Sequence, residues 1–565
     1  MPNRFDIAAT LRTIARLLEI NGENRFKTLA YIRGAAALES LQGELDAVIK
    51  ARRLKETPGI GNALASIIEE VHRTGECWML LQLREQMPPG VIELSEVPGL
   101  SLKKIIALHD ALQIDSVADL KAACREGLVS GVKGFGAKSQ AKLLARIEKL
   151  EDRGKNFILL HHAVEQAENI LRHLRQCPAL IQAEVAGSLR RRKETLRRIC
   201  IVAASDHPRA MMDHFLCFPA LAHTDELEEG RCRARLAGGV PVELAVVPPD
   251  EYIAALHSRT GSRAHLAKLQ TARGAAGADD CGGGSQCGVK SESEIYRRLG
   301  LPYIAPELRE DRGEIEAARS GTLGAPLMFE DIRGMTHCHT AYSDGRNSIE
   351  EMALAAQAMG MTYLTITDHS QSAHYARGVG IDRLRAQWDE IARVQERVRI
   401  KIFKGTEADI LADGSLDYPD PILDRFDIII ASIHARHRMD SDQMTERLLR
   451  ALQLPIFKIW GHPLGRLIPS RPAFACRMEA VLDAISESRC AIEVNGDPHR
   501  LDLEPHWIRL ARDRGIKFIV STDAHSVGGL NNLALGVSMA RRGWLGREDV
   551  LNTLAAKDFM RAVHP

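Results

Sequence analysis

The chain has 565 residues, 45% of them hydrophobic, and its 75 lysines and arginines nearly balance its 74 acidic residues. This length excludes a single small domain, and the lack of any run of about 18 apolar residues excludes a typical membrane-spanning helix. The first residues lack the apolar core of a signal peptide, and the 11 cysteines, which include no Cys-x-x-Cys pair, favour reduced thiols over a disulfide framework. We therefore expect a multidomain cytoplasmic protein with no membrane partner.

The first 152 residues contain two similar glycine motifs. Thr57-Pro-Gly-Ile-Gly61 and Val132-Lys-Gly-Phe-Gly136 each precede a segment of helical character, and Pro98-Gly-Leu-Ser-Leu-Lys103 is a weaker third copy. Glycine lets the backbone approach a phosphate closely, and a helix N-terminus adds free amide donors. A plain connection between helices would explain any single copy, but the repetition favours binding to the DNA backbone. The candidate DNA-binding residues are Gly59, Gly61, Gly134, Gly136, Lys138 and Lys27.

The middle of the chain carries a basic run from Leu189 to Arg198, with six basic residues and one acid. Phosphate binding and an ordinary solvated surface are both open for this run. The stretch at 274–291 is rich in glycine, alanine and serine, and residues 320–330 have the composition of a linker.

Residues 331–565 alternate short β-rich runs with segments of helical periodicity. The runs lie at 332–337, 363–367, 400–403, 426–431, 457–460, 491–495 and 518–520. Helices are expected between them, for example from Ser348 to Met359 and from Glu504 to Asp513. Repeated strand and helix units predict a parallel sheet with right-handed crossovers, closed or nearly closed as a barrel.

Histidines and acids gather where these runs end. The carboxyl ends of the strands of such a barrel open on one face, so residues far apart in sequence converge there. Each residue alone could be a surface or core histidine or a turn cap. The set, with its His-x-His, Asp-His, His-Pro and Asp-x-His motifs, favours a multinuclear metal site. Its expected ligands are His337, His339, Asp344, His369, Glu407, His434, His462, Asp523 and His525.

This region resembles the PHP (polymerase and histidinol phosphatase) domain family. The resemblance rests on motifs such as Thr-His-Cys-His-Thr at 336–340, Gly-His-Pro-Leu-Gly-Arg at 461–466 and Ser-Thr-Asp-Ala-His at 521–525. It implies a distorted (β/α)7 barrel that binds two or three divalent ions, commonly zinc, manganese or iron. The family usually has Asp-Leu before its first histidine, where this chain has Met335-Thr336. We therefore expect a missing carboxylate behind the ligands and an altered orientation of His337.

Nearly the whole chain resembles the family X DNA polymerases, in the bacterial form that ends in a PHP domain. The resemblance rests on the glycine motifs and on Arg25-Phe-Lys-Thr-Leu-Ala-Tyr31, Ala186-Gly-Ser-Leu-Arg-Arg191 and the segment 295–310. It implies a multidomain α/β protein. The implied domains are a helical helix-hairpin-helix domain at 1–88, a fingers-like helix-hairpin-helix domain at 89–152, a nucleotidyltransferase-like α+β palm at 153–250, a thumb-like region at 251–319, a linker at 320–330 and the PHP domain at 331–565.

The same resemblance marks a degenerate polymerase site. After Gly187 and Ser188 the family places two aspartates near the end of a strand, where this chain has Arg198 and Cys200. The third carboxylate position falls at Glu243. One acid beside a permanently charged guanidinium cannot hold the two magnesium ions of nucleotidyl transfer. We therefore expect DNA polymerase activity to be lost and no magnesium to bind in the palm.

The metal barrel is then the expected catalytic centre. We expect hydrolysis of a phosphate ester, with Glu407 and Asp523 as bridging or anchoring carboxylates and Arg466, Arg471 and Arg500 as candidates to bind phosphate. The resemblance implies 3′-5′ exonuclease activity on DNA during repair, by a monomer that contacts DNA without sequence preference. A small-molecule phosphatase of the histidinol-phosphate type and a non-catalytic DNA-binding scaffold are the alternatives.

Overall fold

The computed structural model describes residues 4–275 and 289–564, except 22, 24, 40, 42–44, 76, 86, 88, 89, 96, 98, 99, 154–156, 237 and 238. Backbone contacts divide the chain into two compact units. One comprises Met1–Ile158, Gln166–Ala183 and Arg197–Val246, and the other Leu159–Glu165, Glu184–Leu196 and Val247–Pro565. The expected third glycine motif contains residues 98 and 99 and so lies partly outside the described residues.

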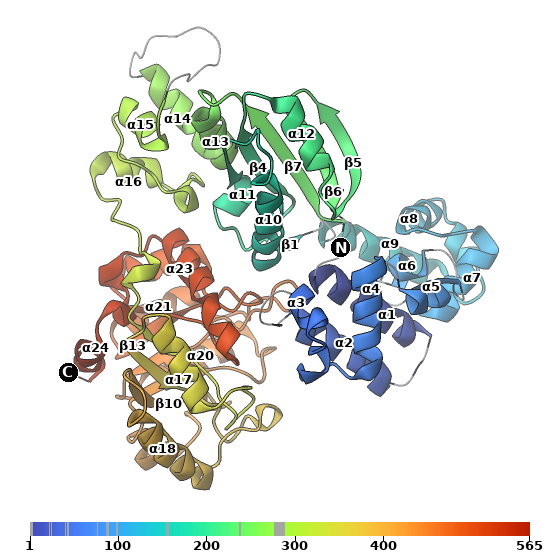
Figure 1. Ribbon diagram of the computed structural model, residues 1–565. Helices are drawn as coiled ribbons and strands as arrows, with labels where there is room; N and C mark the ends of the chain where they lie inside the picture. Colours follow the sequence, from blue (N-terminus) through green and yellow to red (C-terminus); the bar gives the residue numbers. More distant parts are fainter. Residues whose placement is uncertain are drawn as a thin grey trace. The chain divides into compact units, whose positions relative to one another are not determined.

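The N-terminal region is helical (Figure 1). Apolar residues from Ile7 to Ile147 form one core cluster beneath these helices. A 3-10 turn precedes each of the two glycine motifs, at Leu54–Glu56 and Leu128–Gly131. The helices are α1 Arg4–Ile20, α2 Arg25–Glu39, α3 Leu45–Lys50, α4 Asn62–Thr74, α5 Trp78–Glu85, α6 Val91–Ser95, α7 Leu102–Leu112, α8 Val117–Arg125 and α9 Ala137–Arg153.

A five-stranded sheet follows, in the order β2-β4-β7-β6-β5. Strand β6 pairs antiparallel with both β5 and β7, as the expected α+β palm requires. The middle residues of β7 are all buried, whereas every residue of the outer strand β5 is partly or fully exposed. The elements are β1 Ile158–Leu159, α10 Leu160–Leu174, β2 Gln182–Ala186, α11 Gly187–Arg190, β3 Thr195–Leu196, β4 Ile199–Ala204, α12 Pro208–Leu216, β5 Leu221–Glu228, β6 Arg231–Leu236 and β7 Pro241–Val247.

Four helices follow this sheet in the sequence. They are α13 Tyr252–Thr260, α14 Arg263–Ala275, α15 Glu292–Arg298 and α16 Glu314–Ser320. Tyr296 and Ile304 lie in their core, and both are fully buried. Residues 322–328 contain neither helix nor strand.

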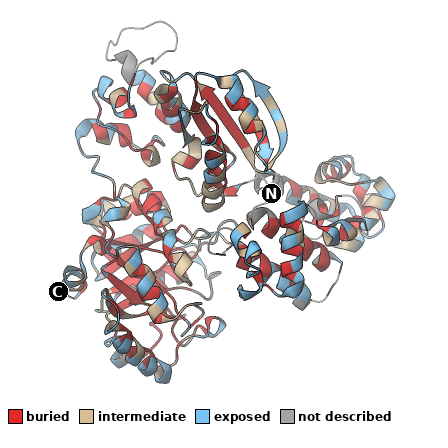
Figure 2. Ribbon diagram, in the orientation of Figure 1, coloured by how far each residue is buried: buried red, intermediate tan, exposed pale blue. Residues whose placement is uncertain are grey.

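Seven parallel strands form the C-terminal sheet in the order β14-β13-β12-β11-β10-β9-β8, which confirms the predicted barrel strands. Figure 2 shows that these strands are almost entirely buried. The strands are β8 Gly334–Met335, β9 Tyr363–Ile366, β10 Lys401–Asp409, β11 Ile428–Ser432, β12 Lys458–Trp460, β13 Cys490–Asn495 and β14 Phe518–Ser521.

Helices connect the strands and cover the outside of the barrel (Figure 1). Both helices predicted in detail are present, since Ser348 and Met359 cap the first and Glu504 and Asp513 cap the second. The helices are α17 Ile349–Ala358, α18 Ile381–Gln395, α19 Asp420–Leu423, α20 Ser441–Leu452, α21 Met478–Ser486, α22 Pro505–Arg512, α23 Leu533–Arg542 and α24 Ala556–Val563. Within the described residues, no helix has the length and apolar character needed to cross a bilayer.

The first and last strands meet along a seam that is only partly hydrogen-bonded by backbone groups. Cys338 and Ala524 form a parallel bridge just beyond the ends of β8 and β14. Asn552 fills the rest of the seam, because its Nδ2 donates to the carbonyls of Gly334 at 2.9 Å and Val520 at 2.8 Å. At the opposite end, Phe559 of α24 stacks on Tyr363 with ring centroids 4.8 Å apart. The barrel is therefore nearly closed and is packed at its amino-terminal end.

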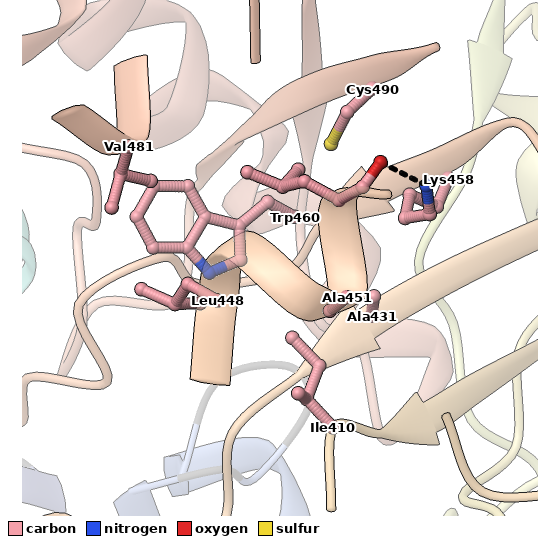
Figure 3. Close-up of a pocket in the computed structure, with 9 residues that line it drawn as sticks. Ile410, Ala431, Leu448, Ala451, Lys458, Trp460, Val481 and Cys490 are labelled. Carbon is pink, nitrogen blue, oxygen red and sulfur yellow. Dashed lines mark hydrogen bonds between the residues drawn. The ribbon is translucent and has the colours of Figure 1, made fainter. Parts of the chain in front are cut away.

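An apolar cavity lies outside the barrel strands, beneath α20 and α21 (Figure 3). Leu448, Trp460 and Val481 line it, and Nζ of Lys458 donates to the carbonyl of Leu454 at 2.7 Å. Because the amine is already bound to the backbone, the cavity offers no convergent polar groups and is a packing space.

Candidate metal centre

Six strand ends bring the nine predicted ligands together at one end of the barrel. Asp344 and His525 have side chains 36% and 37% exposed, while the other seven are largely buried. The strands supply them as follows: His337 and His339 after β8, His369 after β9, Glu407 in β10, His434 after β11, His462 after β12, and Asp523 and His525 after β14. Asp344 lies in the loop before α17, and its Oδ1 is 3.3 Å from Nε2 of His525.

The donor atoms of eight of the nine residues form three groups that share members, and His462 belongs to none of the three. Within each group the donor atoms lie within 4.8 Å of one another. The groups are His339, Asp344, His369 and His525; His337, His339 and Asp523; and His369, Glu407 and His434. Because His339 and His369 each belong to two groups, the arrangement has the form of a multinuclear site.

Glu407 lies at the middle of the arrangement. Its Oε1 is 2.8 Å from Nε2 of His462 and 3.2 Å from Nε2 of His434, and its Oε2 is 2.8 Å from Nδ1 of His369. Nε2 of His337 and Nε2 of His339 each lie 3.6 Å from one of its oxygens. One carboxylate therefore faces five of the six candidate histidines.

Unsatisfied polar atoms show that these residues fit a metal cluster. Buried atoms without a hydrogen-bond partner include Nε2 of His337, Nδ1 of His339, Nδ1 of His369, Nε2 of His434, Nδ1 of His462 and Oε2 of Glu407. Each such atom costs about 1–3 kcal/mol when nothing binds it. Imidazole nitrogens and carboxylates are the ligands that zinc, manganese and iron accept in proteins, so bound ions would remove this cost.

His339 and Glu407 already have the protonation state that metal binding requires. Burial, together with His525 and His369, lowers the pKa of His339 to about 3, so its ring is neutral. Burial alone would raise the pKa of Glu407, but His434, His369 and His337 outweigh burial and hold this pKa well below its usual range. A neutral imidazole and an ionised carboxylate are the forms that bind metals. Neighbouring carboxylates outweigh burial and raise the pKa of His434 and of His525 to about 9, so a metal ion would displace a proton from these two rings.

Two carboxylates behind the ligands were not predicted. Oε1 of Glu493 lies 2.6 Å from Nδ1 of His337, and Oδ1 of Asp409 lies 2.5 Å from Nδ1 of His434. Each carboxylate leaves Nε2 of its histidine directed toward Glu407. The sequence held a signal for Glu493, because an acid within the apolar run 491–495 needs a buried partner.

Glu493 also corrects the expectation drawn from Met335. The sequence led us to expect a missing carboxylate and a misplaced His337, but the carboxylate that binds Nδ1 of His337 comes from β13. Met335 itself is fully buried in β8. A carboxylate therefore holds the ring of His337 although position 335 is not acidic.

The candidate phosphate-binding arginines differ in how far their donors are already used. Nε of Arg466 donates to the carbonyl of Arg500 at 2.8 Å, and its guanidinium also lies 3.0 Å from Glu504 and 3.6 Å from Glu194. Nε of Arg500 lies 3.2 Å from Oδ2 of Asp523, and its buried Nη1 has no hydrogen-bond partner. Arg500, rather than Arg466, therefore has a donor left for a ligand beside the nine residues.

Three arginines surround the acid of the degenerate polymerase site. Oε2 of Glu243 lies 2.8 Å from Nη1 of Arg198 and 3.6 Å from Nε of Arg233, and its Oε1 lies 3.1 Å from Nη2 of Arg231. Arg198 directly precedes β4 and Cys200 is the second residue of that strand, so these positions lie at its start and not near its end as expected. Three cations around one carboxylate repel a divalent ion.

The Gly-Ser pair of the same motif opens a short helix. Gly187 begins α11 with a φ of 62°, a conformation that favours glycine. Oγ of Ser188 accepts a hydrogen bond from Nη2 of Arg191 at 3.2 Å. This hydroxyl is therefore engaged within its own turn.

The two glycine motifs form hairpins of the same geometry. Gly59 and Gly134 have φ values of 95° and 94°. The turns close alike, through bonds from Ile60 N to Thr57 O and from Phe135 N to Val132 O. Gly61 and Gly136 follow, each directly before a helix, and nothing lies within 4 Å of the position that a Cβ would take. Both motifs therefore present a glycine-lined helix N-terminus to their surroundings.

The two predicted DNA-binding lysines are exposed. Lys138 lies in the first turn of α9 and shares a face with Lys142 and Arg146 at four-residue spacing. Nζ of Lys27, on α2, lies 3.5 Å from Oε2 of Glu23. The second hairpin is thus continued by a basic stripe, whereas Lys27 has an acidic neighbour.

Comparisons with known proteins match the same three parts of the chain. Residues 1–77 match the model of a helix-hairpin-helix domain, residues 91–149 that of a SAM-like helix-hairpin-helix tandem, and residues 336–496 that of the PHP domain. Over 566 residues the chain is 34% identical to the DNA polymerase/3'-5' exonuclease PolX of Bacillus subtilis (strain 168), and the match covers 98% of each chain.

Shorter relatives match little more than a third of the chain. The chain is 27% identical over 234 residues to a probable phosphatase of Thermoanaerobacter sp. (strain X514), covering 39% of this chain and 91% of that protein. It is 30% identical over 208 residues to a probable phosphatase of Caldicellulosiruptor bescii, covering 35% of this chain and 81% of that protein.

Proposed function

The chain belongs to the DNA polymerase X family, in the form that joins helix-hairpin-helix domains to a PHP domain, and on this premise we propose that its barrel hydrolyses phosphodiester bonds at the 3′ ends of DNA. The observation that carries the proposal is the convergence of nine ligand-type side chains, with Glu407 at their middle. The full-length relative is named a DNA polymerase/3'-5' exonuclease. DNA repair is the process that such end-trimming serves.

Two or three divalent ions, of zinc, manganese or iron, would be held by the three donor groups. When bound, such ions polarise phosphoryl oxygens and lower the pKa of a coordinated water. The chain's own contribution is a fixed set of charges. Glu407 and Asp523 are both ionised, since the pKa of each is held well below its usual range against the effect of burial. These carboxylates anchor the cluster, and the histidines set its geometry.

Arg500 is the residue we assign to the scissile phosphate. Its Nε is held by Asp523, and this contact leaves Nη1 as a buried donor without a partner. A charged donor in this position would neutralise an anionic phosphoryl group and orient it toward the ligands. Arg466 was another of the three sequence-based candidates, but its contacts with Glu504 and the backbone suit it to holding the loop of Arg500.

The helix-hairpin-helix segments would bind the DNA substrate. Their exposed glycines and helix N-termini suit sequence-independent binding to phosphates, and the basic stripe on α9 adds charge. Glu243 forms ion pairs with three arginines, and these cations argue against the metal binding that nucleotidyl transfer in the palm needs. The proposed enzyme is therefore a DNA exonuclease without polymerase activity.

A small-molecule phosphatase is the second candidate, because the chain matches two probable phosphatases over most of their own length. Such an enzyme would have no use for two DNA-binding segments in the same chain. A scaffold without catalysis is the third candidate, and the three groups of candidate metal ligands argue against it.

One assay tests these candidates together. The full chain is incubated with manganese and a 5′-labelled primer-template, with and without nucleotides, beside a His337→Ala, His339→Ala variant. We expect stepwise shortening from the 3′ end, loss of shortening in the variant and no extension. Shortening that survives the double substitution would place the nuclease elsewhere, and hydrolysis of small phosphate monoesters without attack on DNA would favour the phosphatase.

A further inference from the structure

An exposed aromatic ring stands at the edge of the candidate metal centre. Tyr375 is 68% exposed, the most of any large apolar side chain in the described part of the chain. Its ring centroid nevertheless lies only 5.9 Å from that of His369 and 6.0 Å from that of His434. Burying such a ring would be favourable, so its exposure beside two candidate ligands needs a reason.

The backbone holds this ring in a fixed place. Tyr375 is the middle residue of a 3-10 turn, His374–Ala376, whose neighbours Ala373 and Ala376 are each 1% exposed. The loop is closed at its base, where Val379 N donates to His369 O at 2.8 Å. The backbone at Gly378 packs so tightly that a Cβ there would lie 1.9 Å from the carbonyl oxygen of Ser370. Tyr375 is therefore presented by a rigid loop, which reduces the entropy lost on binding a ligand.

Charges around the ring indicate what kind of ligand fits. The Tyr375 phenol interacts electrostatically with three carboxylates of the centre, Glu407, Asp409 and Asp344, and less strongly with Arg500, whose Nη1 has no partner. Arg471 also lies close enough to interact with this phenol. A ligand between the ring and these arginines would thus meet cationic donors and candidate metal ligands on one side and an open aromatic face on the other. A nucleotide has these two parts, a phosphate and a flat base.

We propose that Tyr375 is a stacking platform for the base of the nucleotide whose phosphate the barrel hydrolyses. This inference rests on the proposed function and narrows it, because it makes base-bearing nucleotide ends the preferred substrates over sugar phosphates and other small phosphate esters. Stacking on an aromatic ring accepts any base, which agrees with a nuclease that has no sequence preference. The ring and not the hydroxyl would carry the effect.

A binding measurement tests the platform without requiring catalysis. Calorimetric titrations of the manganese-loaded full chain compare deoxyadenosine 5′-monophosphate with deoxyribose 5-phosphate, which lacks the base. We expect the nucleotide to bind about tenfold more tightly to the natural chain, within the range for stacking one base. Tyr375→Phe should keep this ratio, and Tyr375→Ala should bring it close to one while the affinity for deoxyribose 5-phosphate and the melting temperature stay unchanged.

The outcomes separate this inference from the proposed nuclease. Equal affinities in the natural chain, no measurable binding of the nucleotide, or a ratio that Tyr375→Ala leaves unchanged would overturn the platform, even if DNA is shortened. If the ratio of the two affinities depends on Tyr375 but the chain shortens no DNA, the proposed nuclease activity is wrong and the proposed base-binding site is supported.

Discussion

Nδ1 of His337 lies 2.6 Å from Oε1 of Glu493, although 156 residues separate them in sequence. The carboxylate fixes the ring so that Nε2 is directed at Glu407 and Asp523, 3.6 and 3.5 Å away. Glu493→Gln keeps the shape of the side chain but removes its charge. Since losing such an outer partner typically costs about 10–100-fold in metal affinity or activity, we expect a loss of that size in manganese-dependent hydrolysis and in metal retained after dialysis. Glu487→Gln, at an exposed site after α21, is the matched control, and an unchanged metal content would contradict the assigned role.

The barrel and its nine clustered residues could be predicted because both follow from local patterns. Apolar runs ending in Asp368-His369 or Asp523-x-His525 identify parallel strands and also place polar groups at their carboxyl ends. Once the strands are parallel, convergence of the ligands needs no further information. The predicted helix from Ser348 to Met359 was equally local, since Ser348 and Glu351 form a capping box.

The contacts that could not be predicted depend on register and on loops. Arg233 faces Glu243 because the β6 and β7 strands pair these two residues directly, and nothing in either strand alone fixes that register. Arg466 looked free in sequence, but its partners Glu504 and the Arg500 carbonyl come from a loop whose path no periodicity describes. The predicted domain boundaries stay predictions.

Primer extension should be absent from this chain. Arg198, Arg231 and Arg233 neutralise the one acid at the palm site, so the chain should not bind the magnesium ions of nucleotidyl transfer. The measurement is extension of a labelled primer with all four nucleotides and magnesium, with the Bacillus subtilis relative as the active control. Extension by the natural chain would show that a metal binds there despite the arginines.

Glu292 should stabilise the compact unit that includes Val247–Pro565, and this stabilisation should depend on pH. Its carboxylate lies 2.5 Å from Nη1 of Arg309 and 2.8 Å from Nη2 of Arg190. Burial opposes ionisation, but the two arginines lower the pKa of Glu292 from 4.5 to about 2. A carboxyl whose pKa is lower in the folded than in the unfolded chain stabilises the fold fully at pH values above its unfolded pKa. This stabilisation decreases as the pH falls toward the folded pKa. Glu292→Gln should therefore cost on the order of 3 kcal/mol near neutral pH.

The natural chain and Glu292→Gln should differ in their free energy of unfolding by a constant amount from neutral pH down to just above 4.5. This difference should then shrink as the pH falls toward 2. Urea unfolding followed at several pH values measures it. Glu316→Gln is a suitable control, because Glu316 is exposed and pairs with a single exposed lysine, Lys268. A difference that grows on acidification would contradict the ion-pair explanation.

Gly136 offers a test of DNA binding that leaves the fold intact. No atom lies within 4 Å of the position a Cβ would occupy at Gly136, and the residue does not have a positive φ. Alanine should therefore fit without strain, but its methyl group would hold a phosphate away from the amides at the start of α9. Losing one such hydrogen bond is worth about 1 kcal/mol, so we expect roughly fivefold weaker binding of duplex DNA by Gly136→Ala, with an unchanged melting temperature.

Gly134 supplies the contrast within the same hairpin. Its φ of 94° is one that side chains rarely adopt, so Gly134→Ala should cost about 1–2 kcal/mol of stability as well as weaken DNA binding. Fluorescence anisotropy with a labelled duplex and thermal unfolding of both variants measure the two effects separately. If the hairpin were only a connection between helices, Gly136→Ala would bind DNA as tightly as the natural chain, because the added methyl group would then meet nothing but solvent.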